Sequence, residues 1–276
     1  MFEIPEIVNF ARQMNDTLKG KTIKTGHLGN SPHKFVWYNR TPQEFEQITR
    51  NKQVGEARTL GRWLLINIEP DYVLVIGEWG GHILFHQPES IMPAKYHLHL
   101  QFDDDSFLTA TTQMWGAAEL YEKGQELERQ YIKDMKLTPL DEGFTLSHFT
   151  DLIDATTKEK KQSVKGLLTQ DQTIPGLGNS IAQDILYLAR LHPKHDLQSL
   201  TDAEVLALYQ SILKTITTCI QKGGRNDEFD LFDQPGGYMR LMDKNAVGKP
   251  CLLCGSQIEK AQYLGGAIYF CPTCQK

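Results

Sequence analysis

The chain has 276 residues, of which 40% are hydrophobic and 23% are charged, and its formal net charge at pH 7 is −5. This composition excludes a disordered chain, and no apolar run approaches the roughly 20 residues that span a bilayer. The start, Met-Phe-Glu-Ile-Pro-Glu, lacks the basic residues and apolar run of a secretory signal, so we expect a cytoplasmic protein with no membrane contact. A weakly acidic chain binds nucleic acid only through a local basic surface.

The first 130 residues combine one helix with short apolar runs. Residues 5–19 have the pattern of an amphipathic helix that opens with Pro5 and Glu6. Short apolar runs separated by turns are typical of an antiparallel sandwich or barrel. We therefore predict an α+β multidomain chain whose N-terminal domain, residues 1–130, is an antiparallel β-sandwich with a leading helix. The predicted strands are 63–68, 73–76, 82–85, 96–102 and 107–110.

Beyond residue 135 the pattern becomes helical, at 145–155, 160–169, 181–190 and 202–221, which predicts a helical domain over residues 135–245. Four lysines gather around Glu159 in this part. They are either a solvated helix face or a local basic surface. Cys219, alone in a helical stretch, is expected to be a small buried residue. The four lysines are Lys158, Lys160, Lys161 and Lys165.

The C-terminal residues 246–276 hold two C-x-x-C pairs that are separated by sixteen residues. Two such knuckles at this spacing are typical of a four-thiolate zinc ribbon, in which the intervening hairpin closes a tetrahedron of sulfurs. Two disulfides or free thiols are the alternatives, but a chain without a secretory signal rarely keeps this pattern except for metal. We predict one structural zinc ion on Cys251, Cys254, Cys271 and Cys274.

A glycine-rich turn, Pro-Gly-Leu-Gly-Asn at residues 175–179, separates two predicted helices. Gly176 and Gly178 allow a close backbone approach, and the N–H groups that open the next helix can bind an anion. Asn179 can cap that helix or donate to a phosphate. Taken alone, the segment is equally a simple turn between helices.

These pieces together resemble the formamidopyrimidine-DNA glycosylase and endonuclease VIII family of base-excision repair enzymes. The resemblance covers the whole chain and implies a helix-two-turns-helix DNA-binding domain, a zinc finger, damaged double-stranded DNA as partner and DNA glycosylase/AP lyase activity. We also expect a monomer. The similar segments are the start at residues 1–7, Gly61–Leu65, Pro175–Asn179, Leu191–Pro193, Pro235–Tyr238 and the cysteine-rich end.

The resemblance also implies which residues act. In the family an N-terminal proline amine attacks C1′ of a flipped nucleotide, and neighbouring carboxylates move protons. Glu3 and Glu6 match the acidic pair, although Glu6 is also explained as a helix N-terminal charge. Binding residues carried over are Arg62, Trp79, Trp115, Lys165, Gly176, Gly178, Asn179 and Tyr238.

The sequence departs from the family at several of these positions. Phe2 replaces the proline, and a large second residue keeps Met1 in place, so the free amine shifts by about 3.8 Å of chain. Arg62 replaces a lysine, which changes the geometry of its phosphate contact, and Gly266 replaces an arginine. Gln113 and Met114 replace the arginines of the loop that fills the duplex. Trp79 and Trp115 can wedge into a base step or lie in the core.

Three functions remain open. The first is a DNA-binding protein that recognises damaged or distorted DNA and whose base excision is weakened or lost. The second is a working glycosylase/lyase that uses the Met1 amine or another nucleophile on an unusual lesion. The third is a zinc-stabilised interaction protein without a DNA role, and Lys165 and Asn179 argue against it.

Overall fold

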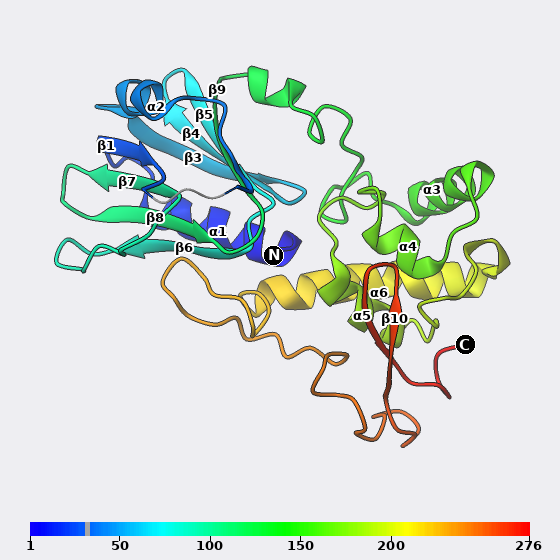
Figure 1. Cartoon of the computed structure of the whole chain (residues 1–276). Coiled ribbons are helices and arrows are strands. Elements are labelled where there is room, and N and C mark those ends of the chain that lie inside the picture. Colours follow the sequence, from blue (N-terminus) through cyan, green and yellow to red (C-terminus); the bar gives the residue numbers. More distant parts are fainter. Residues whose placement is uncertain (31–33) are drawn as a thin grey trace. The chain divides into compact units, whose positions relative to one another are not determined.

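The computed structural model describes residues 1–30 and 34–276, and the chain divides into two compact units (Figure 1). The first unit comprises Met1–Asp134 and Lys222–Gly237, and the second comprises Met135–Gln221 and Tyr238–Lys276. The described helices include none that is long and apolar enough to cross a membrane.

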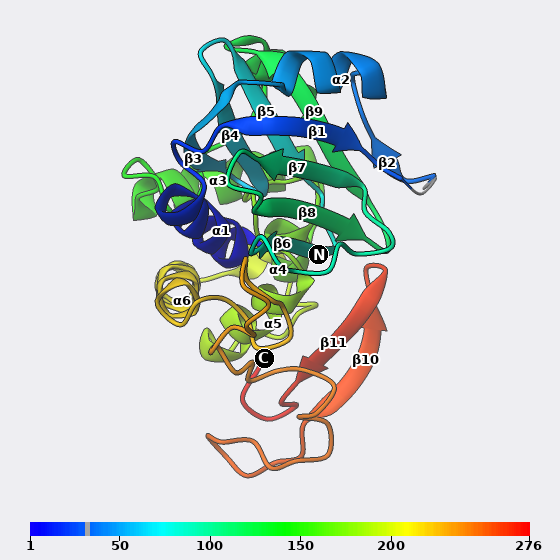
Figure 2. The ribbon, with the colours of Figure 1, turned by 90° about the vertical axis from the view of Figure 1, so that its left-hand side faces the viewer.

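The first unit is a β-sandwich of two sheets. One sheet has the strand order β1-β7-β8-β6 and the other β2-β9-β5-β4-β3 (Figure 2). Every strand pair is antiparallel except β2 with β9, so the predicted antiparallel sandwich is confirmed. The strands are β1 (Ile23–Leu28), β2 (Val36–Trp37), β3 (Gln53–Leu60), β4 (Trp63–Glu69), β5 (Tyr72–Gly77), β6 (Gly81–His86), β7 (Leu98–Phe102), β8 (Phe107–Thr112) and β9 (Gly116–Glu122).

Strand β5 is the centre of the five-stranded sheet, between β4 and β9. Its residues Val73–Ile76 are almost completely buried, as expected for a continuous apolar run covered on both faces. Helix α1 (Ile4–Thr17) packs against β3 and β4 and adds Ile7, Phe10 and Met14 to the same core. The leading helix is therefore part of the sandwich and fixes where the N-terminus lies.

The first unit also contains α2 (Pro42–Thr49), which packs against β1, and the 3-10 helix η1 (Gln125–Glu128). Sequence analysis missed α2 because it is short and carries few apolar residues. Its signal was the capping box, in which Thr41 Oγ1 accepts from the Glu44 N–H while the Glu44 carboxylate accepts from the Thr41 N–H.

The segment Lys222–Gly237 returns to the first unit, whereas we had assigned residues 135–245 to one helical domain. Its attachment is specific. The Phe85 N–H donates to the Leu231 carbonyl oxygen at 2.8 Å, and the Leu231 N–H donates to Gln13 Oε1 at 3.0 Å. Leu231 itself is fully buried in the sandwich core. These contacts join residues more than 140 positions apart, which periodicity in the sequence cannot reveal.

The second unit is helical and ends in a two-stranded hairpin (Figure 1). One predicted helix, residues 160–169, starts only at Val164, because Ser163 caps it by accepting from the Gly166 N–H and Lys160 is extended. The elements are α3 (Leu146–Glu159), α4 (Val164–Thr169), α5 (Asn179–Leu188), η2 (Leu197–Ser199), α6 (Asp202–Gln221), β10 (Glu259–Tyr263) and β11 (Gly266–Phe270).

We predict that Gly77→Ala destabilises the first unit. A Cβ at residue 77 would lie 1.9 Å from Cε3 of the buried Trp63 ring, so the ring must move, at a cost of about 1–3 kcal/mol. Denaturation followed by tryptophan fluorescence measures this, because all four tryptophans lie in the first unit. Gly80→Ala is the control, because the nearest atom to its Cβ is 3.6 Å away. Equal stability of the two variants would contradict the prediction.

Candidate functional site

Phe2, which stands where the resemblance implies a proline, anchors the N-terminus of the first unit. The Phe2 side chain is 2% exposed, and its ring packs edge-on against Phe10 with the centroids 4.9 Å apart. The Phe2 amide N–H donates to the Trp79 carbonyl oxygen at 3.0 Å. The nitrogen at position 2 is thus an amide engaged in a hydrogen bond, and the free amine belongs to Met1.

Arg225 lies buried beneath the N-terminus, with only 2% of its side chain exposed. Its Nη2 donates to Glu6 Oε2 at 2.9 Å and its Nε to Glu6 Oε1 at 3.1 Å. Nη1 lies 3.5 Å from Glu3 Oε1, and Nη2 also reaches the Met1 carbonyl oxygen and Glu228 Oε1. One guanidinium therefore joins both carboxylates that sequence analysis had selected.

The electrostatics of this cluster follow from burial and close opposite charges. Burial by itself would raise the pKa of Glu6, but the charge and hydrogen bonds of Arg225 outweigh it and hold that pKa below its usual value. Burial would likewise lower the pKa of Arg225, and the charges of Glu6 and Glu3 raise it instead. Glu6 and Arg225 are therefore held in their ionised forms.

The Met1 amine sits at the edge of this cluster, 3.2 Å from Glu228 Oε1. Arg62, at the turn between β3 and β4, lies beside it, with Nη1 3.4 Å from the Met1 sulfur and Nη2 3.3 Å from Glu78 Oε1. Arg62 Nε is buried and has no hydrogen-bond partner among the described residues. The structure thus brings Met1, Glu3, Glu6 and Arg62 together around the N-terminus.

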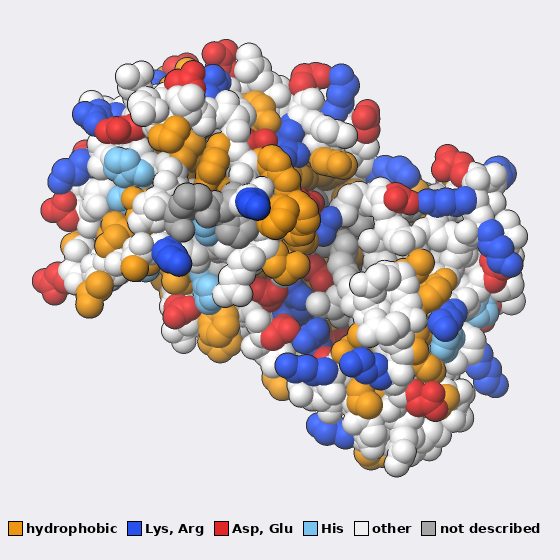
Figure 3. Space-filling model, in the orientation of Figure 1, with side chains coloured by type: hydrophobic (Ala, Val, Ile, Leu, Met, Phe, Trp, Pro, Cys, Tyr) orange, Lys and Arg blue, Asp and Glu red, His pale blue; other side chains and the backbone are white. Residues whose placement is uncertain are grey.

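The two tryptophans that were candidates for base stacking differ in environment. Trp79 is 1% exposed and its Nε1 donates to the Thr111 carbonyl oxygen. Trp79 is therefore a core residue and does not present its ring at the surface. Trp115 is 41% exposed and stacks on Trp37, with ring centroids 5.3 Å apart and planes inclined by 3°. Figure 3 shows other apolar side chains at the surface of the first unit. Trp37 had not been singled out in the sequence.

In the second unit, Lys165 and Tyr238 direct their polar atoms inward. Lys165 is 2% exposed, its Nζ donates to the Tyr263 carbonyl oxygen at 2.6 Å, and burial lowers its pKa. The Tyr238 hydroxyl donates to Asp184 Oδ2 at 2.9 Å, and the Leu241 N–H donates to the same carboxylate. These residues tie the hairpin and the segment after Gly237 to α4 and α5.

The glycine-rich turn lies where α5 begins. Gly176 has a φ of +85°, which favours glycine, and Gly178 precedes the first helical residue, Asn179. Asn179 is exposed, and its Nδ2 lies 3.4 Å from the Ala267 carbonyl oxygen of β11. A Cβ at Gly266 would be 3.6 Å from the same Nδ2. Gly266, where the resemblance implies an arginine, is therefore adjacent to Asn179.

The four cysteines of the C-x-x-C pairs form one cluster, whose sulfur atoms all lie within 4.8 Å of one another. The Sγ atoms of Cys251 and Cys274 are 3.9 Å apart, and those of Cys254 and Cys271 are 3.5 Å apart. A tetrahedron with metal–sulfur bonds of about 2.3 Å has sulfur–sulfur edges of about 3.8 Å. The cluster can therefore hold a metal ion. The hairpin β10–β11 lies between the two pairs, as predicted.

Arg225 and Glu228 are the functional candidates that sequence analysis missed. Both lie in the segment Lys222–Gly237, which we had assigned to the helical domain, and Arg225 meets Glu6 across 219 positions. A weak indication of such a partner was present in the sequence. Glu3 and Glu6 stand at the start of an amphipathic helix, and carboxylates that become buried there need a cation as partner. Nothing in the sequence identified which cation.

Comparison with known proteins gives consistent results. The model of the formamidopyrimidine-DNA glycosylase N-terminal domain matches residues 1–114, and that of its H2TH domain matches residues 136–229. The chain is 25% identical over 280 residues to the formamidopyrimidine-DNA glycosylase of Bacillus cereus, covering 100% of this chain and 99% of that one. It is 27% identical over 289 residues to that of Halalkalibacterium halodurans, covering 100% of both chains.

Solved structures agree in fold. A complex of Lactococcus lactis Fpg with DNA containing an abasic site matches with a TM-score of 0.87 at 22% identity, covering 99% of each chain. A complex of the same wild-type protein with DNA containing N7-benzyl-Fapy-dG matches equally well. The two matched domains together span more than half of the chain, in the family's order. The chain belongs to the formamidopyrimidine-DNA glycosylase and endonuclease VIII family.

Proposed function

We propose that this chain binds damaged or distorted double-stranded DNA as a repair-type protein, and that its glycosylase and AP lyase activity is weakened or lost. The family relationship and the DNA in the solved relatives support the DNA partner. On the protein side, exposed Trp115, exposed Asn179 and Arg62 beside the N-terminus are the proposed DNA contacts. Lys165 and Tyr238 act by positioning, because their polar atoms hold the second unit together.

The observation that carries the loss of excision is the state of the nitrogen at position 2. The attack on C1′ needs the free lone pair of an amine. The Phe2 nitrogen is an amide whose N–H donates to the Trp79 carbonyl oxygen. The free amine lies one residue earlier and pairs with Glu228. Misplacing a reacting group by about 1 Å can cost about 100-fold in rate, and this displacement is larger.

The ion pair between Arg225 and Glu6 also supports the proposed loss of base excision. A general acid or base must gain and lose a proton near neutral pH. The guanidinium of Arg225 holds the pKa of Glu6 low and occupies both of its oxygens. Glu6 is thereby a structural counter-ion of Arg225 and is not available to move a proton.

The second candidate function is an active glycosylase/lyase that uses the Met1 amine. It is favoured by one observation, which is that this amine lies at the surface beside the carboxylates and Arg62. Such a mechanism would require the pair with Glu228 to open before the amine could attack.

Reversal of the substitution tests the proposal. We expect wild-type protein to begin at Met1 by mass spectrometry, to bind an abasic-site duplex, and to form a borohydride-trapped adduct at least about 100-fold more slowly than Phe2→Pro. The variant should lose Met1 and place a secondary amine at position 2. Phe2→Ala is the matched control, because it also permits methionine removal but presents a primary amine.

Three outcomes separate the candidates. Wild-type adduct formation at the rate of Phe2→Pro would refute the loss of catalysis and favour Met1. Adducts from neither protein, with DNA binding retained, would favour a binding-only role. Absence of binding to any duplex at low salt would favour an interaction protein without a DNA role.

The cluster around Arg225 also predicts a pH dependence. Because the pKa of Glu6 is lower in the folded chain than its usual value of 4.5, its contribution to stability is present above pH 4.5 and is lost as the pH falls through the folded pKa. We expect the free energy of unfolding of wild type to fall more steeply below pH 4.5 than that of Glu6→Gln. Tryptophan fluorescence in denaturant measures it, with exposed Glu89→Gln, which should follow wild type, as control.

We further propose that the ion in the four-cysteine cluster is one structural Zn²⁺, the usual ion of closed four-thiolate sites. Cys271→Ser should abolish zinc, measured as one equivalent per wild-type chain by elemental analysis, and should weaken DNA binding. Tryptophan fluorescence should be unchanged, because every tryptophan lies in the first unit. Cys219→Ala, outside the cluster, should keep its zinc. Undiminished DNA affinity without zinc would exclude the ribbon from the DNA contact.

A further inference from the structure

Three side chains on one face of α5 contact the ribbon, which comprises the β10–β11 hairpin and the cysteine cluster. They are Asn179, Gln183 and Tyr187, which lie in a row because they are four residues apart. Gln183 binds β11 twice. Its Nε2 donates to the Ala267 carbonyl oxygen at 2.8 Å, and its Oε1 accepts from the Tyr269 N–H at 3.2 Å. The helix α5 therefore holds the ribbon from its first residue to its last turn.

Tyr187 makes the contact with the cysteine cluster. Its side chain is 2% exposed and packs with Met242, Ile258 and the two buried cysteines, Cys251 and Cys271. Its hydroxyl oxygen lies 3.3 Å from Cys251 Sγ. A cysteine that binds a metal ion is a thiolate, which has no proton to donate. In the metal-bound protein the hydroxyl is therefore the donor and the sulfur is the acceptor.

The charge of a closed four-cysteine site gives this donor its importance. Four thiolates exceed the charge of one divalent ion by two, and the excess is unfavourable where water is excluded. Water can reach Cys254, which is exposed, but Cys251 is 4% exposed. At Cys251 the donors are the Tyr187 hydroxyl and the Leu253 N–H, whose nitrogen is 3.4 Å from the sulfur. Loss of a hydrogen-bond partner of a metal ligand typically lowers metal affinity about 10–100-fold.

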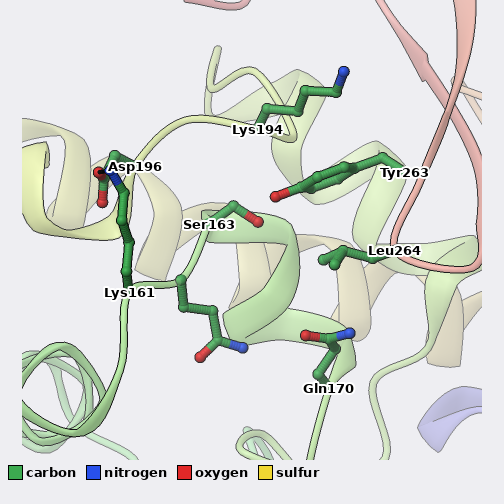
Figure 4. Close-up of a pocket in the computed structure, with 8 residues that line it drawn as sticks. Lys161, Ser163, Gln170, Lys194, Asp196, Tyr263 and Leu264 are labelled. Atoms are coloured by element: carbon green, nitrogen blue, oxygen red, sulfur yellow. Dashed lines mark ion pairs between the residues drawn. The ribbon is translucent and has the colours of Figure 1, made fainter.

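The other end of the hairpin is held by different contacts. Figure 4 shows Tyr263 and Leu264 at this end beside Ser163, the cap of α4. The Tyr263 carbonyl oxygen accepts from Lys165 Nζ at 2.6 Å. The hairpin end thus rests on α4, and the cysteine end is joined to α5 by Tyr187.

We propose that Tyr187 is a positioning residue of the metal site. Its hydroxyl donates to the Cys251 thiolate, stabilises the metal-bound cluster and binds the loaded ribbon to the last turn of α5. The inference rests on the proposed metal ion in the cluster. It gives α5, which begins beside the glycine-rich turn, a direct link to metal binding.

Tyr187→Phe tests the inference, because it removes the hydroxyl and keeps the buried ring. We expect its affinity for Zn²⁺, measured by competition with a chromogenic chelator, to fall about 10-fold. With Co²⁺ in place of Zn²⁺, the sulfur-to-metal charge-transfer band should shift, because the donor withdraws electron density from the thiolate. Tyr209→Phe is the matched control. Its hydroxyl donates to the Phe144 carbonyl oxygen in the same unit, so affinity and band should equal those of wild type.

A second variant separates the packing of the ribbon from the bond to sulfur. Gln183→Leu removes the two contacts with β11 and leaves the Tyr187 hydroxyl in place. Amide hydrogen exchange at Tyr269 should accelerate in this variant, because that N–H loses its acceptor. The Co²⁺ band should stay where it is in wild type.

The outcomes distinguish the inference from the metal site on which it rests. Weaker Zn²⁺ binding together with a shifted band, in Tyr187→Phe alone, supports the inference. Affinity and band equal to wild type overturn it and leave the proposed zinc ion intact. Weaker binding with an unchanged band also overturns it, because Tyr187 would then act through packing alone. If wild type binds neither Zn²⁺ nor Co²⁺, the proposed metal ion itself fails, and the inference fails with it.

Discussion

The first unit depends on one buried cation. Arg225 is almost wholly removed from water, and an uncompensated charge in that position would be prohibitively costly. The Glu6 carboxylate accepts two hydrogen bonds from the Arg225 side chain and a third from its backbone N–H, and Glu3 and Glu228 add further negative charge. The N-terminal helix, the segment after α6 and the position of the first residue are all fixed by this arrangement.

The same cluster connects the substitution at position 2 with the proposed loss of base excision. Phe2 fills space next to Phe10, and Arg225 satisfies the charge requirement of the two carboxylates. The start of the first unit is thus packed by apolar side chains, and its buried charges are compensated by one another. In the second unit, by contrast, Asn179 is exposed beside the glycine-rich turn, and the four cysteines form a cluster that can hold a metal ion.

Sequence reasoning succeeded where the signal is local. The cysteine spacing predicted a closed cluster around a hairpin, and the continuous run at Val73–Ile76 predicted a central strand. It failed where a contact joins distant residues or where a polar side chain overrides periodicity. The role of Arg225 could not be predicted because Glu3 and Glu6 lie about 220 positions away. The break before α4 depends on a single serine cap.

The return of Lys222–Gly237 to the first unit has a consequence for biosynthesis. On the ribosome the sandwich strands emerge first, but Arg225 and Leu231 follow only after the helices of the second unit up to Gln221 have been made. At about 5–20 residues per second, Arg225 is synthesised roughly 10 seconds or more after Glu3 and Glu6. The first unit is therefore completed only after the helices of the second unit have been synthesised, although it begins the chain.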